Sequence, residues 1–335
     1  MEILYLGHYE NGSTSRMRGE YLKEILQPKL FSVADINIPL LATNKIARSF
    51  GWRYKKGPLI KNINQYAVSI INNKWNYDLV WIDKGVFIDP AIVEKLKQQS
   101  AKLVHFTPDP AFAYHRSKLF YSAIPYYDYC ITTKSFEIEL YKQQGANVLF
   151  CTQGFHPAVH RPYYSFAEKR GAVFIGHHEK WKEEIIAKLL ENKIAVTLAG
   201  INWQQFAKKK ATNNLLHYKG KGIFGEEYAR AISKAQIGLG FLSKLVPELH
   251  TTRTFEIPAC CTALLTEYTT EIANVYKDDE AIFYSSPDEL VTKTKYALQN
   301  PAWLNAITQK GHQKIVTGGY DYKSILQKLL AQIYP

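Results

Sequence analysis

The sequence contains few cysteines and no long hydrophobic run. Its four cysteines show no Cys-x-x-Cys spacing and two of them lie in apolar runs, so we expect buried free thiols in a reducing compartment. No apolar run approaches the ~20 residues that span a bilayer. The segment 1–7 lacks the basic start and long apolar core of a signal peptide and is typical of a short strand. We therefore expect a cytoplasmic protein, with peripheral membrane contact left open.

Several binding motifs are absent as well. No Gly-x-Gly-x-x-Gly follows a candidate strand and no Gly-x-x-x-x-Gly-Lys-Ser/Thr occurs, which argues against dinucleotide oxidoreductases and P-loop NTPases. Neither His-Glu-x-x-His nor paired cysteines occur, and the adjacent His177 and His178 should point apart. Because no Asp-x-Asp follows a strand, a metal–diphosphate site of that type is not expected. We therefore expect neither a metal nor a cofactor.

The most evident positive feature is an excess of basic residues. The 335 residues include 42 Lys and Arg against 30 Asp and Glu, a net charge of +12 that is spread along the chain. Such a charge favours anionic partners: nucleotides, phosphorylated lipids, a membrane surface or nucleic acid. No nucleic-acid module is recognisable, so we expect no nucleic-acid partner. The basic aromatic segment 52–57 could dock on an anionic membrane or a lipid-linked acceptor, or be a solvated loop.

Short apolar runs alternate with helical patterns along the whole chain. Most runs are nearly continuous, as in parallel strands covered on both faces. They lie at 3–7, 31–36, 79–83, 103–107, 130–133, 148–152, 173–176, 196–200, 216–220, 237–242, 263–266 and 282–285. Helical patterns lie between them, and three more helices are predicted at 287–299, 301–311 and 320–333. Two successive arrays of this kind predict an α/β protein with two doubly wound, Rossmann-like domains.

The two predicted domains meet at a proline-containing join near residue 160. We expect the N-terminal domain at 1–160 and the second domain at 161–318, while a C-terminal helix at 319–335 could return to the first domain. Ligands of such sheets bind beyond the carboxyl ends of the strands. Two domains facing each other would therefore place these loops around one cleft.

In the first half, two groups of polar residues follow predicted strands. Gly12 precedes a Ser-Thr-Ser run that can cap the next helix, whose amides could hold an anion together with Arg16 or Arg18. An ordinary capped turn is the alternative. His105 and Asp109 lie at another strand end, where a histidine could orient a reacting hydroxyl and a carboxylate could act as base. A structural histidine is the alternative there.

In the second half, two strand ends carry glycines and basic or aromatic residues. The strand end at 176 could let a phosphate approach the backbone, and the strand end at 218–220 could admit a nucleotide base beside backbone amides. Each could also be a plain turn. The residues concerned are Gly176, His177 and Lys180 at the first strand end, and Tyr218, Lys219 and Gly220 at the second.

Near the end of the second half, Glu248 and Glu256 flank Arg253. If the stretch is helical, this spacing brings both carboxylates near one face. Carboxylates can accept hydrogen bonds from ribose and sugar hydroxyls, and a cation beside them can hold a diphosphate. A solvated amphipathic helix is the alternative.

The residues around this arginine also resemble a known family. The stretch 251–258, Thr-Thr-Arg-Thr-Phe-Glu-Ile-Pro, and the run 264–267 resemble the C-terminal domain of CgeB-like (spore-maturation-protein-like) glycosyltransferases. These are related to glycosyltransferase family 4 and have the GT-B fold of two Rossmann-like domains. The resemblance extends over nearly the whole chain, including 81–85, 102–109 and 174–177.

The resemblance implies that a sugar moves from a nucleotide-sugar donor, expected to be UDP-linked, to a glycan or lipid-linked acceptor. The second domain would hold the donor and the first domain the acceptor, in surface-polysaccharide synthesis, with retention and without a metal. Glu256 would hold the ribose hydroxyls, Glu248 would contact the donor sugar, and Arg253 would neutralise the diphosphate, with Thr252 beside it. Two alternatives are a sugar-nucleotide epimerase of the same architecture and a basic protein that binds nucleic acid or an anionic surface.

Overall fold

The computed structural model describes residues 1–71, 76–113 and 115–335, which form two compact units. The N-terminal domain comprises Met1–Thr152 together with Tyr322–Pro335, and the C-terminal domain comprises Gln153–Asp321. The segment 153–160, expected in the first domain, belongs to the second. The reason is local packing, because Phe155 is buried in a core of the C-terminal domain and forms a β-bridge with Asp321.

A six-stranded parallel sheet forms the centre of the N-terminal domain, in the order β2-β1-β3-β4-β5-β6. Its strands are β1 (Glu2–Gly7), β2 (Leu30–Asp35), β3 (Tyr77–Asp83), β4 (Ser100–Thr107), β5 (Tyr129–Thr132) and β6 (Val148–Phe150). The six runs predicted in the first half correspond to these strands. The order reverses between β1 and β3, and open α/β sheets bind ligands at such a switch point.

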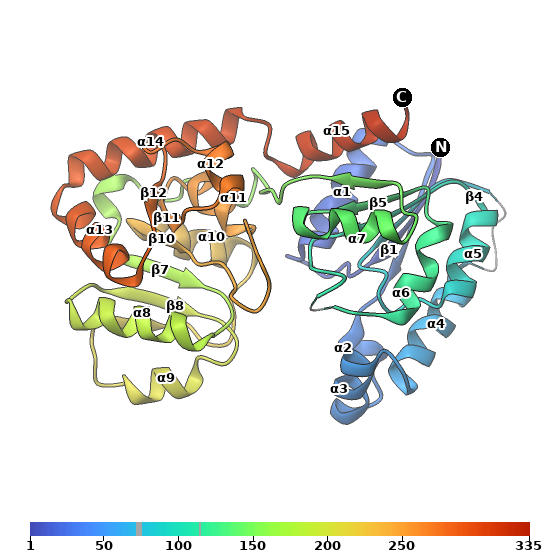
Figure 1. The fold of residues 1–335 in the computed structure, drawn as a ribbon, viewed down its shortest axis with the longest axis horizontal. Helices are drawn as coiled ribbons and strands as arrows, with labels where there is room; N and C mark the ends of the chain where they lie inside the picture. Colours follow the sequence, from blue (N-terminus) through green and yellow to red (C-terminus); the bar gives the residue numbers. More distant parts are fainter. Residues whose placement is uncertain (72–75, 114) are drawn as a thin grey trace. The chain divides into compact units, whose positions relative to one another are not determined.

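Helices cover both faces of this sheet (Figure 1). They are α1 (Thr14–Leu26), α2 (Ile38–Leu41), α3 (Lys45–Tyr54), α4 (Pro58–Ile71), α5 (Pro90–Gln98), α6 (Lys118–Ala123), α7 (Ile138–Gln143) and α15 (Tyr322–Ile333). Successive side chains of a strand point to opposite faces. Leu4 and Leu6 of β1 accordingly join the core under α4, α5 and α6, whereas Ile3 and Tyr5 join the core under α1 and α15. The helix α15 thus packs beside α1 and completes the N-terminal domain.

The C-terminal domain has a second six-stranded parallel sheet, in the order β12-β11-β10-β7-β8-β9. Its strands are β7 (Ala172–Ile175), β8 (Val196–Ala199), β9 (Leu216–Tyr218), β10 (Ile237–Gly240), β11 (Ala263–Glu267) and β12 (Ile282–Tyr284). This is the dinucleotide-fold order, with the switch point between β7 and β10. Its helices are α8 (Lys180–Glu191), α9 (Gln204–Lys209), α10 (Gly225–Lys234), α11 (Arg253–Ala259), α12 (Thr270–Val275), α13 (Pro287–Gln299) and α14 (Pro301–Thr317).

Three further findings concern sequence expectations. The four cysteines are free thiols, three of them buried and Cys151 half-buried. None of the helices in the described ranges is long and apolar enough to cross a membrane. The segment 52–57, expected between secondary-structure elements, begins inside α3, which ends at Tyr54. Its exposed aromatic and basic side chains therefore belong partly to a helix rather than to a loop.

Candidate functional site

Arg253 lies across the switch point of the C-terminal domain. It is the first residue of α11, and its Nη2 donates to the carbonyl oxygen of Phe241 at 2.9 Å. Its Nη1 lies 3.5 Å from the carbonyl oxygen of Ile175. Phe241 directly follows β10 and Ile175 ends β7, so one guanidinium joins the carboxyl ends of the two strands between which ligands bind in such sheets.

Glycines let the backbone of neighbouring strand ends pack closely beside this arginine. A β-carbon on Gly176 would lie 3.2 Å from Nη1 of Arg253 and 2.8 Å from the ring of Phe174. A β-carbon on Gly200, which follows β8 with a φ of +142°, would lie 1.9 Å from the carbonyl oxygen of Gly176. The N–H of Gly200 in turn donates to the carbonyl oxygen of Gly220 at 3.0 Å. Three successive strand ends therefore meet through glycines, and a ligand can approach their backbone closely.

Positive charge is concentrated at this point. Arg253 is half-buried, its Nε has no hydrogen-bond partner among the described residues, and it takes part in no ion pair there. A second cation, the buried Lys182 of α8, donates to Glu179 at 2.6 Å. Burial lowers the pKa of Lys182 and the nearby Arg253 charge adds to the lowering, while the hydrogen bond to Glu179 opposes both. A bound anion would relieve this repulsion, so the arrangement favours a phosphate or diphosphate.

Glu248 lies in the loop between β10 and α11. Its Oε2 accepts a hydrogen bond from the backbone N–H of Ser243 at 3.0 Å, which closes the loop on itself. The possibility that Glu248 and Glu256 share one face of a helix is therefore wrong. Only Glu256 is helical, because α11 begins at Arg253 and Thr252 occupies its N-cap position.

Glu256 is covered by two side chains that the sequence analysis did not single out. The hydroxyl of Tyr228, on α10, donates to Oε2 of Glu256 at 2.5 Å, and Nε2 of His160 lies 3.7 Å from Oε1. Glu256 is only 4% exposed. Burial lowers the pKa of His160 and Glu256 opposes that effect. No pattern in the sequence pairs Tyr228 with a glutamate 28 positions later.

The other predicted residues of this domain lie on both sides of the switch point. His177 is exposed directly after Gly176, and Lys180 begins α8 with its Nζ 3.4 Å from Glu183. Tyr218 ends β9, two strands away from β7, and its buried hydroxyl has no hydrogen-bond partner among the described residues. Lys219 is exposed beside it. The structure thus brings Gly176, Arg253 and Gly220 into one row, with Tyr218 and Lys219 at its far end.

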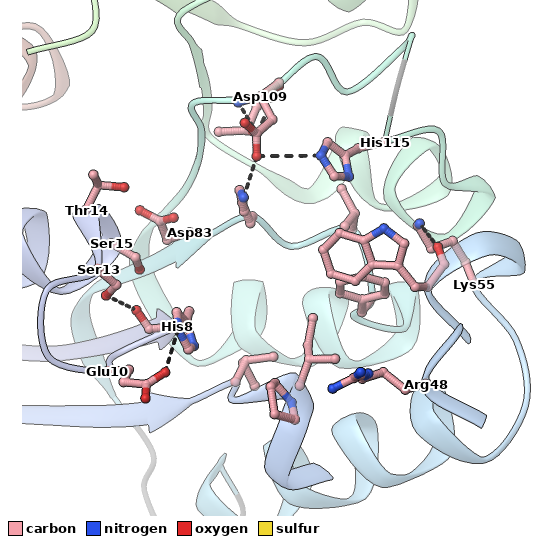
Figure 2. Close-up of a pocket in the computed structure, with 18 of the residues that line it drawn as sticks. His8, Glu10, Ser13, Thr14, Ser15, Arg48, Lys55, Asp83, Asp109 and His115 are labelled. Atoms are coloured by element: carbon pink, nitrogen blue, oxygen red, sulfur yellow. Dashed lines mark hydrogen bonds and ion pairs between the residues drawn. The ribbon is translucent and has the colours of Figure 1, made fainter. Parts of the chain in front are cut away.

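The N-terminal domain has a cavity of about 960 Å³ at the carboxyl ends of β1, β3 and β4 (Figure 2). The Ser-Thr-Ser run after Gly12 lines it, and Ser13 caps α1 by accepting from the N–H of Arg16 at 3.1 Å. Gly12 itself, with a φ of +82°, forms the preceding turn and is not in the wall. Arg18 is not free to hold an anion, because it is buried in a two-bond pair with Asp83, at 2.8 and 3.0 Å.

Asp109 reaches this cavity and His105 does not. The carboxylate of Asp109 pairs with Lys84 and lies 3.6 Å from Nε2 of His115. Burial would raise the pKa of Asp109, but the charge of Lys84, with a smaller contribution from His115, holds it below its ordinary value. His105 is fully buried between the rings of Phe120 and Tyr127, at 4.4 and 5.2 Å. Burial lowers the pKa of His105 to about 3.

The neutral His105 therefore belongs to the core beneath the cavity, not to its wall, and the structure gives it no reacting partner. Neither ring nitrogen has a hydrogen-bond partner among the described residues. Across 1–71, 76–113 and 115–335, no three His, Cys, Asp or Glu side chains are grouped so that they could hold a metal ion.

Comparisons with known proteins relate the two domains to enzymes of sugar transfer. Residues 178–331, slightly less than half of the chain, match a family described as glycosyl transferase-like. None of the curated proteins matches the chain. Similar solved structures include sucrose-phosphate synthase from Thermosynechococcus elongatus, at 14% identity and a TM-score of 0.69, covering 100% of this chain and 99% of the other.

Two further structures are similar over nearly their whole length. The Anabaena protein HepE in complex with UDP-glucose has 13% identity and a TM-score of 0.67, covering 100% of this chain and 99% of its own. A Listeria monocytogenes protein described as a UDP-N-acetylglucosamine 2-epimerase has 11% identity and a TM-score of 0.60, covering 99% and 95%. At such identities the likeness shows the fold, and it confirms the predicted GT-B class. Together with the family match, it supports a glycosyltransferase enzyme.

Proposed function

We propose that this chain, with a glycosyl transferase-like domain on a GT-B fold, transfers a sugar from a UDP-linked donor to a glycan or lipid-linked acceptor. The observation that carries the proposal is the half-buried Arg253, which takes part in no ion pair of the described residues and joins the strand ends at the switch point. The UDP-glucose complex of HepE supports a uridine nucleotide. The resemblance to CgeB-like members of glycosyltransferase family 4 supports retention and a role in surface-polysaccharide synthesis.

In this proposal the C-terminal domain stabilises the departing diphosphate. Negative charge develops on the leaving group as the sugar–oxygen bond breaks, and fixed cations and amides lower the energy of that state. Arg253 and Lys182 supply fixed cations beside the closely packed glycines at the strand ends, so no metal is required for this role. Glu248 contacts the donor sugar from its loop. Glu256 would hold a ribose hydroxyl at Oε1, which lies beside His160, because Tyr228 occupies Oε2.

The cavity of the N-terminal domain is the proposed acceptor site. The pKa of Asp109 lies below its ordinary value, so this carboxylate is ionised at neutral pH and can accept a hydrogen bond from an acceptor hydroxyl. His115 and Lys84 hold it in place.

A sugar-nucleotide epimerase is the second candidate, because the Listeria monocytogenes protein that is described as an epimerase has a similar fold. An epimerase needs the same binding site for the nucleotide-sugar donor but no acceptor. The two candidates are therefore separated by following UDP-glucose and UDP-N-acetylglucosamine by NMR with and without added acceptor sugars. Turnover of the donor alone to an epimer would favour the epimerase, whereas release of UDP that depends on an acceptor would favour the transferase.

Peripheral contact with an anionic membrane, at its cytoplasmic side, is also part of the proposal. Apolar side chains of α2 and α3 are strongly exposed, with Leu40 at 79% and Ile46 at 82%. The exposed Lys45, Arg48 and Arg53 lie on the same helix as Ile46. Exposed apolar groups flanked by cations are the combination that binds anionic bilayer surfaces.

The direct test of the function is nucleotide binding measured by calorimetry. The wild-type chain should bind UDP and UDP-glucose without added metal, and Arg253→Ala should lose that binding while keeping its circular dichroism spectrum. Lys208→Ala, which removes an exposed cation from the same domain, is the matched control. Equal UDP affinity in Arg253→Ala and the wild type would contradict the assignment of this site.

A further inference from the structure

We infer that the cavity of the N-terminal domain binds an anionic group of the acceptor, a phosphate or a carboxylate, against the side chains of Lys55 and Arg48. The inference rests on the proposed function for the identity of the ligand as an acceptor. It names the chemical class of that acceptor, which neither the fold nor the family match specifies.

The first observation is the charge balance of the cavity wall. Seven Lys and Arg residues line the cavity against three Asp and Glu residues. Arg18 is neutralised by Asp83 and Lys84 by Asp109, while Glu10 lies beside His8. The cations that remain without a carboxylate among the described residues are Lys45, Arg48, Arg53, Lys55 and Arg116. Such an excess in a concave wall attracts negative charge and disfavours cationic ligands.

The second observation is that one of these cations is buried. Lys55 is 8% exposed, at the C-terminal end of α3 with a φ of +54°. Its ammonium donates to the carbonyl oxygen of Trp52 and lies 5.5 Å and 5.0 Å from the ring centroids of Trp52 and Phe87. Burial, with no carboxylate contributing, lowers the pKa of Lys55. A buried charge without a counter-ion is costly, and a bound anion would remove that cost.

The third observation is the shape and composition of the rest of the wall. A volume of about 960 Å³ is large for a lone inorganic ion and suits a ligand of sugar size or larger. Ile36, Ile38 and Phe87 supply apolar surface, and Trp52, which is 39% exposed, can contact a sugar face. The ligand that fits is therefore a sugar or lipid carrying an anionic group.

The cations without a carboxylate partner and the reactive carboxylate Asp109 lie in different parts of the cavity wall. Figure 2 shows Arg48 and Lys55 on the side of the cavity across from the Ser-Thr-Ser run at 13–15. Asp109 is held by Lys84 and His115, and the ring of His115 meets that of Trp52 edge-on at 5.6 Å. If Arg48 and Lys55 hold the anionic group of the ligand, the neighbouring part of the ligand lies against Trp52 and can reach Asp109. Holding one end of the acceptor in this way positions its hydroxyl for reaction.

The test compares anionic and neutral probes on the full chain. Glucose 6-phosphate, glucuronate and glucose are titrated by calorimetry into the wild type, Lys55→Met, Arg48→Gln and the exposed control Lys61→Met. We expect at least one anionic probe to bind the wild type at least tenfold more tightly than glucose. Lys55→Met and Arg48→Gln should weaken that binding at least tenfold, and Lys61→Met should leave it unchanged. Arg48 is exposed, so its variant keeps the test valid if Lys55→Met fails to fold.

UDP binding, measured on the same samples, separates the two proposals. The anionic subsite would be overturned if the wild type binds UDP but binds the three probes equally, or binds none of them. The transferase function would remain supported in that case. A wild-type chain that does not bind UDP would overturn the proposed function itself. Competition between glucose 6-phosphate and phosphatidylglycerol vesicles distinguishes the source of the anion: displacement from the vesicles indicates a lipid-borne group, and no displacement indicates a soluble acceptor.

Discussion

A β-carbon on Gly176 would stand 3.2 Å from Nη1 of Arg253, closer than most such contacts in proteins. The guanidinium also donates to the carbonyl oxygen of Phe241, so it cannot move away from Gly176 without straining or losing that hydrogen bond. The glycine therefore fixes the position of the arginine that we propose binds diphosphate.

Gly176→Ala should accordingly weaken UDP binding about tenfold, or about 1.4 kcal/mol, while Arg253→Lys should weaken it further because an ammonium cannot reach both strand ends. Calorimetric titration of UDP gives both values, and thermal melts monitor the fold. If Gly176→Ala binds UDP as well as the wild type does, the close contact has no role in the site.

A second prediction concerns Tyr228 and Glu256. Tyr228→Phe removes the hydroxyl that satisfies Oε2 of a carboxylate that is only 4% exposed. An unsatisfied buried acceptor costs about 1–3 kcal/mol, so chemical denaturation should show a loss of stability of that size. Because Oε1 remains, UDP affinity should fall less than in Glu256→Ala. A Tyr228→Phe variant that is as stable as the wild type would show that solvent or another group already satisfies Glu256.

A third prediction separates the structural and catalytic roles of His105. In the folded chain its pKa is about 3, whereas the unfolded chain takes up a proton near pH 6.5. The unfolded state then binds more protons between these values, so His105 makes stability fall as pH decreases from 6.5 to 3. In His105→Phe, which keeps a ring between Phe120 and Tyr127, this fall should be shallower by up to about 1.4 kcal/mol per pH unit.

The measurement is urea unfolding at several pH values, and activity at neutral pH is the companion readout. His105→Phe should retain donor turnover, because the side chain does not reach the cavity. A large loss of kcat with unchanged stability would instead support the catalytic role that the strand-end position of His105 first indicated.

These residues show why the fold was easier to predict than the site. Apolar runs such as 79–83 and 103–107 lie in parallel strands buried on both faces, and this leaves a signal within a few neighbouring residues. The sequence indicates Arg253 because Glu248 and Glu256 flank it in a stretch that resembles a known family. The pairing of Glu256 with Tyr228, and the burial of His105, depend on side chains that are 28 and 15 to 22 positions away and are brought near only by tertiary packing.

A fourth prediction tests the exposed apolar surface of α2 and α3. Ile46→Ser and Phe50→Ser remove side chains that are 82% and 45% exposed and contribute nothing to the buried core. Each should weaken binding to phosphatidylglycerol vesicles about tenfold, because burying one such side chain in a bilayer is worth about 1.5–3 kcal/mol. Vesicle sedimentation measures this, and Val316→Ser, which changes an exposed side chain on α14, is the control. Unchanged vesicle binding by both variants would show that any membrane contact lies elsewhere. Equal binding of the wild type to phosphatidylcholine vesicles would show that the neighbouring cations have no role in it.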